Sequence, residues 1–267
     1  MESNSEYIGR RISIPENIKA LYSHFYFAEN SSNTTVTRTL LPSFQVMLIF
    51  SLGTPVSIKL KGKEIFTIDR FLMLGPVKKA LEYQLPPQSE IIVVNFLGDA
   101  TYNLFGLSQV NQHFISSFYK DCLIVIWKHI FELPDANSRA EYLLSVGQSY
   151  LCQTAPLSLS FTDDCIQTPK AKYIAEKYSK TVRTVQMQYQ KKFGFSAKEY
   201  HRYQRFIRAI EFIQSCIEAD RLVDWAELVF EFGYYDQSHL IRDFKHYIHL
   251  TPSQYLAIQY QVCGISA

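Results

Sequence analysis

Proline is distributed very unevenly along this chain of 267 residues. Eight of the ten prolines lie between Pro15 and Pro156, whereas only Pro169 and Pro252 follow, each directly after a threonine. Proline interrupts helices, but a Thr-Pro pair suits a helix start, with threonine as the N-cap. The sequence therefore predicts an early part rich in turns and a helical part of about one hundred residues.

The first 115 residues alternate short apolar runs with turn residues such as Gly53, Gly75 and the pair Pro86-Pro87. Several short runs at near-regular spacing predict an antiparallel sandwich or barrel, whose mouth can hold a small ligand. The expected strands are 24–28, 34–41, 45–52, 55–60, 64–68, 71–74 and 91–96.

Residues that would carry catalysis or bind a metal are sparse in this part. His24 and His113 are its only histidines, and neither belongs to an HxH or HxxxE pair. A barrel of the cupin type needs several histidines and a carboxylate to hold its ion. The chain also lacks GxSxG, P-loop and GxGxxG motifs. We therefore expect no metal, no cofactor, no catalytic residue and no enzymatic activity.

The opening residues and the cysteines indicate a cytoplasmic protein. Residues 1–13 carry four charged side chains and lack the apolar run of a secretory leader. The longest purely apolar run, residues 122–127, is too short to span a membrane. The five cysteines are scattered without a CxxC pair, which is typical of reduced thiols. We expect no membrane partner.

Residues 116–155 are predicted to form a helical segment with two helices, 116–133 and 138–152. Helices attached to a barrel can pack on the chain's own sheet or pair with a second copy, and the sequence leaves both open. Apolar residues recur at helical spacing at Phe118, Cys122, Val125, Ile126, His129 and Ile130, then at Tyr142, Leu143, Val146 and Leu151.

Charge is concentrated in the helical part, although the net charge is only +2. Residues 170–208 hold eleven Lys and Arg against two Glu, whereas residues 211–245 hold eight acidic and three basic side chains. A basic block inside a near-neutral chain is either the footprint of a polyanion site or a solvated helix face.

The helical part contains two similar helix–turn–helix units. In the first, Thr168 begins a helix, Thr181 caps the next helix and Gly194 ends it. In the second, Asp224 begins a helix, Gly233 breaks it, and Asp236 or Ser238 caps the next. The capping box Ser196–Glu199 opens a long helix between the units, and Thr251-Pro252 opens the last one.

Two such units joined by one rigid helix suit duplex DNA, because the second helix of each can enter the major groove one duplex turn apart. The alternative is a helical module for protein contacts. The tight loops, capped second helices and basic flanks favour DNA.

Residues 232–245 read FGYYDQSHLIRDFK, and TPSQY follows at 251–255. This pattern closely resembles the signature of AraC-family transcription regulators, GY-D-SHF-R-FK and then G-TP-Y. The first unit is similar but looser over 181–206. The resemblance covers about residues 166–260. It implies a sequence-specific bacterial regulator, often dimeric and ligand-responsive, whose two recognition helices bind successive major-groove segments.

The sequence departs from the family pattern at a few positions. Thr181 replaces a usual serine, Met187 a basic residue and His249 the glycine before Thr-Pro. In the N-terminal part, Pro42-Ser43-Phe44 stands where a sensor subtype has Pro-Asp-Gly. These changes affect base preference and local turns more than DNA binding itself.

The expected fold is α+β with two domains. Residues 1–160 form a β-rich sensor or dimerisation domain, a cupin-like antiparallel barrel or sandwich with the helical segment attached. Residues 166–262 form the AraC-type double helix-turn-helix domain, with two units joined by the long helix.

The outward side chains of the two recognition helices are the expected DNA contacts, because arginine pairs with guanine and glutamine with adenine. Arg242 has an alternative, an internal ion pair with Asp236 or Asp243. The candidate base contacts are Arg183, Gln186, Met187, Gln190, Gln237, Ser238, His239 and Arg242. The candidate phosphate contacts are Thr181, Lys191, Lys192, Lys198 and Arg202.

Three functions are weighed. The first is a sequence-specific DNA-binding transcription regulator controlled by a small ligand or by dimerisation through the N-terminal domain. The second is a regulator without ligand sensing, whose N-terminal domain serves only protein contacts. The third, an enzyme carrying this module, needs a reactive cysteine or metal cluster, and neither is visible. The expected partners are double-stranded DNA, a small-molecule effector of unknown identity, a second copy in a homodimer, and RNA polymerase.

Overall fold

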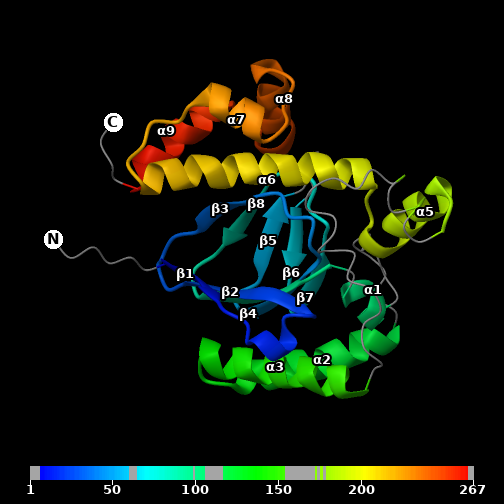
Figure 1. Ribbon diagram of the computed structural model, residues 1–267. Helices are drawn as coiled ribbons and strands as arrows, with labels where there is room; N and C mark the ends of the chain where they lie inside the picture. The colour runs from blue at the N-terminus through cyan, green and yellow to red at the C-terminus, as the bar shows by residue number, and fades with distance from the viewer. Residues whose placement is uncertain are drawn as a thin grey trace. The chain divides into compact units, whose positions relative to one another are not determined.

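The computed structural model describes residues 7–59, 65–98, 100–105, 117–153, 172, 175–176 and 179–263. The chain divides into two compact units, residues 1–165 with 187–194 and residues 166–186 with 195–267. Helices α6 to α9 belong to the second unit, whereas α5 is divided between the two units at residue 187 (Figure 1). Thr168 and Pro169, the predicted start of its first helix, lie outside the described residues, as do Gly62 and His113.

The first unit is built on two antiparallel sheets. The five-stranded sheet has the order β1-β2-β9-β4-β7, and the four-stranded sheet has the order β3-β8-β5-β6. The strands are β1 (Tyr7–Ile12), β2 (Tyr22–Asn30), β3 (Val36–Leu40), β4 (Met47–Gly53), β5 (Val56–Lys59), β6 (Ile65–Ile68), β7 (Phe71–Leu74), β8 (Leu81–Leu85) and β9 (Ser89–Phe96).

The inner strands β4 and β9 of the five-stranded sheet are buried on both faces, which explains their continuous apolar runs. Along β4, Met47 and Ile49 belong to one core cluster, whereas Leu48 and Phe50 belong to another. Side chains alternate between the faces of a strand, so one cluster lies on each face. The cluster with Met47 and Ile49 includes residues of the four-stranded sheet. The cluster with Leu48 and Phe50 includes residues of the attached helices.

Helices cover the face of the five-stranded sheet that carries Leu48 and Phe50 (Figure 1). Leu123 and Ile130 of one helix and Leu143 of the next are buried in this cluster with strand residues such as Phe25. The helices of this unit are the short η1 (Glu16–Ile18), α1 (Ala100–Phe105), α2 (Ser117–Glu132) and α3 (Ala136–Gln153). The predicted α+β sandwich with attached helices is confirmed.

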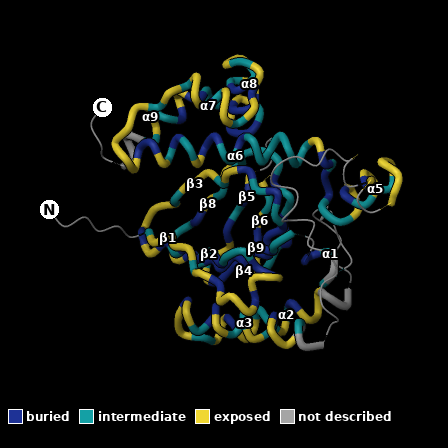
Figure 2. The backbone as a smooth tube through the Cα atoms, viewed as in Figure 1, coloured by how far each residue is buried: buried dark blue, intermediate teal, exposed yellow. Residues whose placement is uncertain are grey.

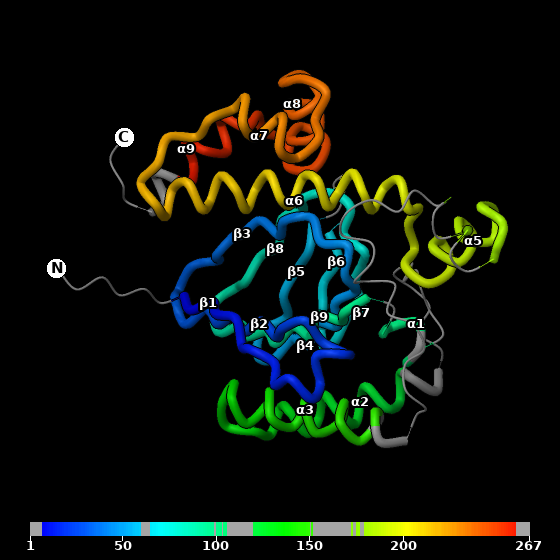
Figure 3. Tube along the Cα trace, viewed as in Figure 1, coloured from blue at the N-terminus to red at the C-terminus, as the bar shows by residue number. Residues whose placement is uncertain are grey.

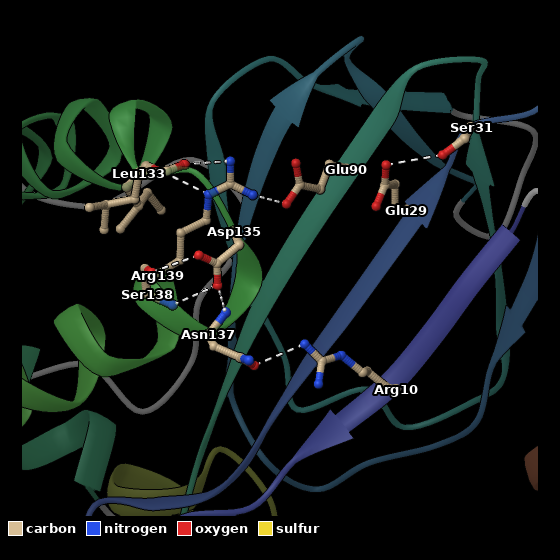
Figure 4. Close-up of polar contacts among 10 residues, drawn as sticks. Arg10, Glu29, Ser31, Glu90, Leu133, Asp135, Asn137, Ser138 and Arg139 are labelled. Atoms are coloured by element: carbon tan, nitrogen blue, oxygen red, sulfur yellow. Dashed lines mark hydrogen bonds and ion pairs between the residues drawn. The ribbon is translucent and has the colours of Figure 1, made fainter.

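The turn between α2 and α3 is held by charged side chains (Figure 4). Nε of the buried Arg139 donates to the carbonyl of Ile130 at 2.9 Å, and Nη2 donates to that of Leu133 at 2.9 Å. Its guanidinium also pairs with Glu90 of β9. Asp135 accepts from the backbone N–H of Ser138, which caps the start of α3. This corner therefore fixes the helical hairpin against the sheet.

One sequence expectation for α2 is wrong. Among the residues at helical spacing, Cys122, Val125 and His129 are exposed, and the buried positions are Leu123 and Ile130. Several apolar residues follow one another in this helix, so the pattern alone fits more than one buried face.

In the second unit, α7, α8 and α9 lie along the same side of α6 (Figure 3). Phe206 of α6 packs against Phe244 at 5.1 Å and Tyr247 at 4.6 Å between ring centroids. Phe244 also contacts Tyr255 of α9, at 5.9 Å. The bounds are α5 (Val182–Phe193), α6 (Ala197–Glu218), α7 (Trp225–Glu231), α8 (Gln237–Ile248) and α9 (Pro252–Cys263).

Most predicted helix signals of this part are confirmed. Ser196 and Glu199 form the reciprocal capping box of α6, and Asp224 caps α7. Thr251 Oγ1 accepts from the backbone N–H of Gln254, as expected at the start of α9. Among the described helices, none has the length and apolar character needed to cross a bilayer.

Candidate nucleic-acid interface

The start of α8 is set by Asp236. The backbone turns at Gly233, which has φ of 69° and therefore suits a residue without a side chain. Asp236 Oδ1 then accepts from the backbone N–H of His239 at 2.6 Å. Of the two predicted caps, Asp236 caps the helix. Ser238 is therefore not the cap and lies on the first turn.

Helix α8 has one buried and one exposed side. Leu240, Phe244 and Tyr247 are buried against the rest of the unit. Ser238, Arg242 and Lys245 are exposed, and their spacing of four and three residues places them in one line along the helix. Gln237 is exposed at the first helical position. The helix therefore presents polar and basic side chains on a surface of its own.

A buried carboxylate holds α8 on α6. Asp243 is 0% exposed. It accepts from Arg202 Nε at 2.7 Å and from Arg205 Nη2 at 3.1 Å. A buried charge is tolerated when it is paired and hydrogen-bonded, as here. The two arginines therefore fix the rotation of α8 about its own axis and the side chains that it exposes.

His239 lies beside this cluster and is only partly exposed. Arg205 Nη2 lies 2.9 Å from His239 Nε2. Because a guanidinium can only donate, Nε2 accepts, and the imidazole is neutral. Burial, and next the positive charge of Arg205, lower the pKa of His239. The ring also packs edge-on against Tyr234, with 5.3 Å between centroids.

Arg242 is not the partner of either neighbouring carboxylate. Asp243 is paired with Arg202 and Arg205, and Asp236 caps the helix. Arg242 Nε instead donates to the backbone carbonyl of Ser238 at 3.2 Å, one turn earlier, and the side chain is exposed.

Helix α5 shows the same division into a buried and an exposed side. Val185 and Tyr189 are buried. Thr181 Oγ1 accepts from the backbone N–H of Thr184 at 3.1 Å, and Gly194, with φ of 72°, follows the last residue. The four predicted base contacts of this helix, Arg183, Gln186, Met187 and Gln190, are all exposed and share one face.

The predicted phosphate contacts have different environments. Thr181, Lys191 and Lys198 are exposed, and Lys192 is half-buried. The Arg202 side chain is 37% exposed and engaged with Asp243. Its position at the edge of the buried cluster gives it a structural role that the sequence did not reveal.

Sequence reasoning missed two residues that shape this surface, Lys245 and Arg205, and it considered Asp243 only as a partner of Arg242. Lys245 lies on the exposed line of α8. Its spacing of seven residues from Ser238 indicates this position. Arg205 and Asp243 belong to the buried cluster, but a pairing across 38 residues leaves no periodic signal. Within the described ranges, no three His, Cys, Asp or Glu side chains are grouped to hold a metal ion.

Comparison with known proteins connects this geometry to a family. A family model described as a helix-turn-helix domain matches residues 174–258. The sequence matches no curated protein.

Among solved structures, ToxT from Vibrio cholerae in its P21 form is 11% identical, with a TM-score of 0.42 over 95% of this chain and 99% of that chain. ToxT of strain SCE256 bound to an unsaturated fatty acid is 10% identical, with a TM-score of 0.44 over 100% and 99%. A putative ethanolamine utilization protein from Salmonella typhimurium is 9% identical, with a TM-score of 0.27 over 34% and 68%.

The matched segment contains α5 to α8 and most of α9. The same segment carries the capped, partly basic helices described above. Residues 174–258 therefore form a helix-turn-helix domain, and the protein is a DNA-binding transcription regulator.

Proposed function

We propose that the protein reads two successive major-groove segments of duplex DNA, one with α5 and one with α8. The bases are contacted by Arg183, Gln186, Met187 and Gln190 on α5, and by Gln237, Ser238, His239 and Arg242 on α8. The observation that carries this proposal is the exposed side of α8, which the buried Asp243 cluster holds in a fixed rotation. A recognition helix needs such a fixed register to address particular bases.

Within this proposal the candidate contacts differ in strength. Arg242 and Gln237 are exposed, with side chains suited to guanine and adenine. His239 is hydrogen-bonded to Arg205, so a base contact from it requires an edge of the ring that this bond leaves open. The phosphates are contacted by Thr181, Lys191, Lys192, Lys198 and Arg202. Such contacts set the orientation of the protein on the duplex rather than its sequence preference.

The experiment is a binding measurement with single variants on a selected site and on random duplex. Arg183→Ala, Gln186→Ala and Arg242→Ala should each lose about 1–3 kcal/mol on the selected site. Each should also relax preference at one base pair. Glu227→Gln, on the exposed side of α7, is the matched control and should keep both affinity and preference. Unchanged affinity and preference in all three variants would refute the assignment.

The N-terminal domain, residues 1–160, is proposed to control DNA binding through a small-molecule effector or through a homodimer, with RNA polymerase as a further partner in the cytoplasm. Polar groups within the sandwich support an effector site. Tyr7 and Tyr26 are joined through their hydroxyls at 3.0 Å, and the Arg38 guanidinium lies 4.5 Å from the Tyr7 ring centroid. The residues around them are mainly apolar, as in small-molecule sites.

The competing proposal is an N-terminal domain that serves protein contacts alone. A panel of sugars, carboxylic acids and aromatic metabolites separates the two through the melting temperature of the full chain, which a ligand of the native state raises. An effector bound beside Tyr7, Tyr26 and Arg38 should no longer raise the melting temperature of the Arg38→Ala and Tyr26→Phe variants. No shift across the panel favours protein contacts alone.

A further inference from the structure

The turn between α7 and α8 carries two tyrosines with opposite environments. Tyr234 is 5% exposed, and its backbone N–H donates to the carbonyl of Val229 at 3.0 Å. Tyr235 follows it directly and is 91% exposed. Figure 2 shows exposed positions next to buried ones along α7, α8 and their connection. Tyr235 therefore contributes no packing to the core, and its ring and hydroxyl are available to a partner.

The buried neighbour fixes the place from which Tyr235 projects. The Tyr234 ring lies edge-on to the His239 ring, and the Arg205 guanidinium lies 4.7 Å from the Tyr234 ring centroid. The same arginine belongs to the buried cluster that holds α8 on α6. Tyr235 thus has a constant position, one residue before the cap Asp236.

This position lies at the edge of the groove when α8 binds DNA as proposed. The N-terminal residues of a recognition helix contact base edges, and on α8 these are Gln237 and Ser238. Tyr235 precedes them outside the helix, so it meets the wall of the groove instead of its floor. Phosphates and sugars form that wall, and tyrosine hydroxyls are among the groups that bind them.

The charges around the start of α8 do not suit a phosphate. Residues 222–241 contain no lysine or arginine, and Arg242 lies more than one turn into the helix. The same stretch contains four carboxylates, those of Asp224, Glu227, Glu231 and Asp236. A carboxylate repels a phosphate, whereas a neutral hydroxyl donates a hydrogen bond to it. Tyr235 supplies such a donor where this stretch has no cation.

We infer that the Tyr235 hydroxyl donates to a backbone phosphate at the groove edge and so positions α8 on the duplex. The anchor of α8 is thereby uncharged, whereas the proposed phosphate contacts beside α5 include the lysines Lys191 and Lys192. A neutral donor adds affinity without adding to the salt dependence, because no cation displaces counterions from the phosphate. This inference rests on the proposed reading of DNA by α8 and adds a positioning residue to it.

Tyr235→Phe tests the hydroxyl on the full chain. It should weaken binding to the selected site about tenfold, because a hydrogen bond to a charged group is lost. Base preference and the slope of log K against log salt should stay native, and so should the melting temperature of this exposed variant. Phe230→Ala is the control, since it removes an equally exposed aromatic side chain from α7, and it should keep native affinity.

Tyr235→Lys tests the position independently of the hydroxyl. A cation beside a phosphate releases a counterion, so this variant should steepen the slope of log K against log salt by about one. Phe230→Lys adds the same charge at an equally exposed site on α7 and should leave the slope native. A role of Tyr235 in folding alone would not produce this difference between the two lysine variants.

Duplexes in which one phosphate is replaced by an uncharged methylphosphonate locate the contact. One replacement beside the block read by α8 should weaken binding of the native chain and cost the Tyr235→Phe variant less. This non-additivity is the signature of a direct contact. Equal losses in the two chains at every phosphate would contradict the contact.

The outcomes separate this inference from the proposal on which it rests. Native affinity of Tyr235→Phe, or a native salt slope of Tyr235→Lys, overturns the phosphate anchor. If Arg242→Ala still relaxes the preference at one base pair, base reading by α8 stands without the anchor. If Arg242→Ala also leaves affinity and preference unchanged, the proposed reading by α8 falls with it.

Discussion

Arg205 Nη2 on α6 lies 2.9 Å from His239 Nε2 on the first turn of α8, and the same guanidinium nitrogen lies 3.1 Å from the buried Asp243. One arginine therefore connects the start of α8 with its buried middle. The Arg205 guanidinium also lies 4.7 Å from the Tyr234 ring centroid. The charge state of the His239 imidazole is thereby linked to the position of α8.

Acidification should destabilise the helical unit through His239. Its pKa is lowered from 6.5 by burial and by Arg205, with smaller opposing and supporting effects from Asp243, Arg242 and Arg202. Between 6.5 and the lowered value the unfolded chain binds more protons, so stability is full above 6.5 and falls as the pH drops through the folded pKa. Denaturation midpoints from pH 8 to pH 5 measure this.

The His239→Gln variant keeps a group that can accept from Arg205 but cannot titrate. Its midpoint should depend less on pH than that of the native chain over the same interval. Equal slopes in the two chains would show that His239 does not carry the pH effect.

Removing the charge of Asp243 should strongly destabilise the same unit. Asp243→Asn leaves Arg202 and Arg205 without their carboxylate, and breaking a buried ion pair costs about 3 kcal/mol. Urea unfolding of the full chain measures the loss. Glu227→Gln breaks the exposed pair with Arg221, at 3.6 Å, and should cost less than about 0.5 kcal/mol. Similar losses in both variants would contradict the special role of the buried cluster.

Replacing His249 with glycine should stabilise the protein. His249 follows α8 with φ of 63°, in the left-handed region. A residue with a side chain is destabilised by about 1 kcal/mol in the left-handed region, and glycine is not. The free energy of unfolding of His249→Gly should therefore rise by about that amount. His249→Ala removes the imidazole but keeps the strain, so an equal gain in this control would point to the ring instead of the backbone.

The proposed contacts between lysines and phosphates should make the affinity for DNA fall as the salt concentration rises. Lys198 is exposed on the first turn of α6, and a phosphate contact releases a counterion when it forms. Lys198→Gln should weaken binding to all duplexes equally and flatten the slope of log K against log salt by about one. An unchanged slope, or a change in base preference, would place Lys198 elsewhere in the complex.

Local signals predicted much of the fold. Apolar runs located most strands, and caps such as Ser196 and Asp224 located helix starts, because these features act within a few residues. Strands β1 and β8 and helix α1 were not predicted. Strand β1 is exposed over Ile8–Arg11 and so lacks a long apolar run, and β8 is a short run in which Glu82 and Gln84 are exposed.

The candidate site was predicted less completely, for a different reason. Exposure along α5 and α8 follows helical spacing, which the sequence contains. The pairing of Arg202 and Arg205 with Asp243 depends on tertiary packing of α6 against α8, and spacing does not encode it. The same limit explains α2, where the apolar pattern alone did not distinguish the buried face from the exposed one.

Selection of binding sites from random and genomic duplexes by the full-length protein, at moderate salt, tests the central claim most directly. Two short sequence blocks about one helical turn apart are predicted, one for each recognition helix. Arg183→Ala should relax one block and Arg242→Ala the other. Failure of the full chain and of residues 166–267 to enrich any sequence would contradict base reading by α5 and α8.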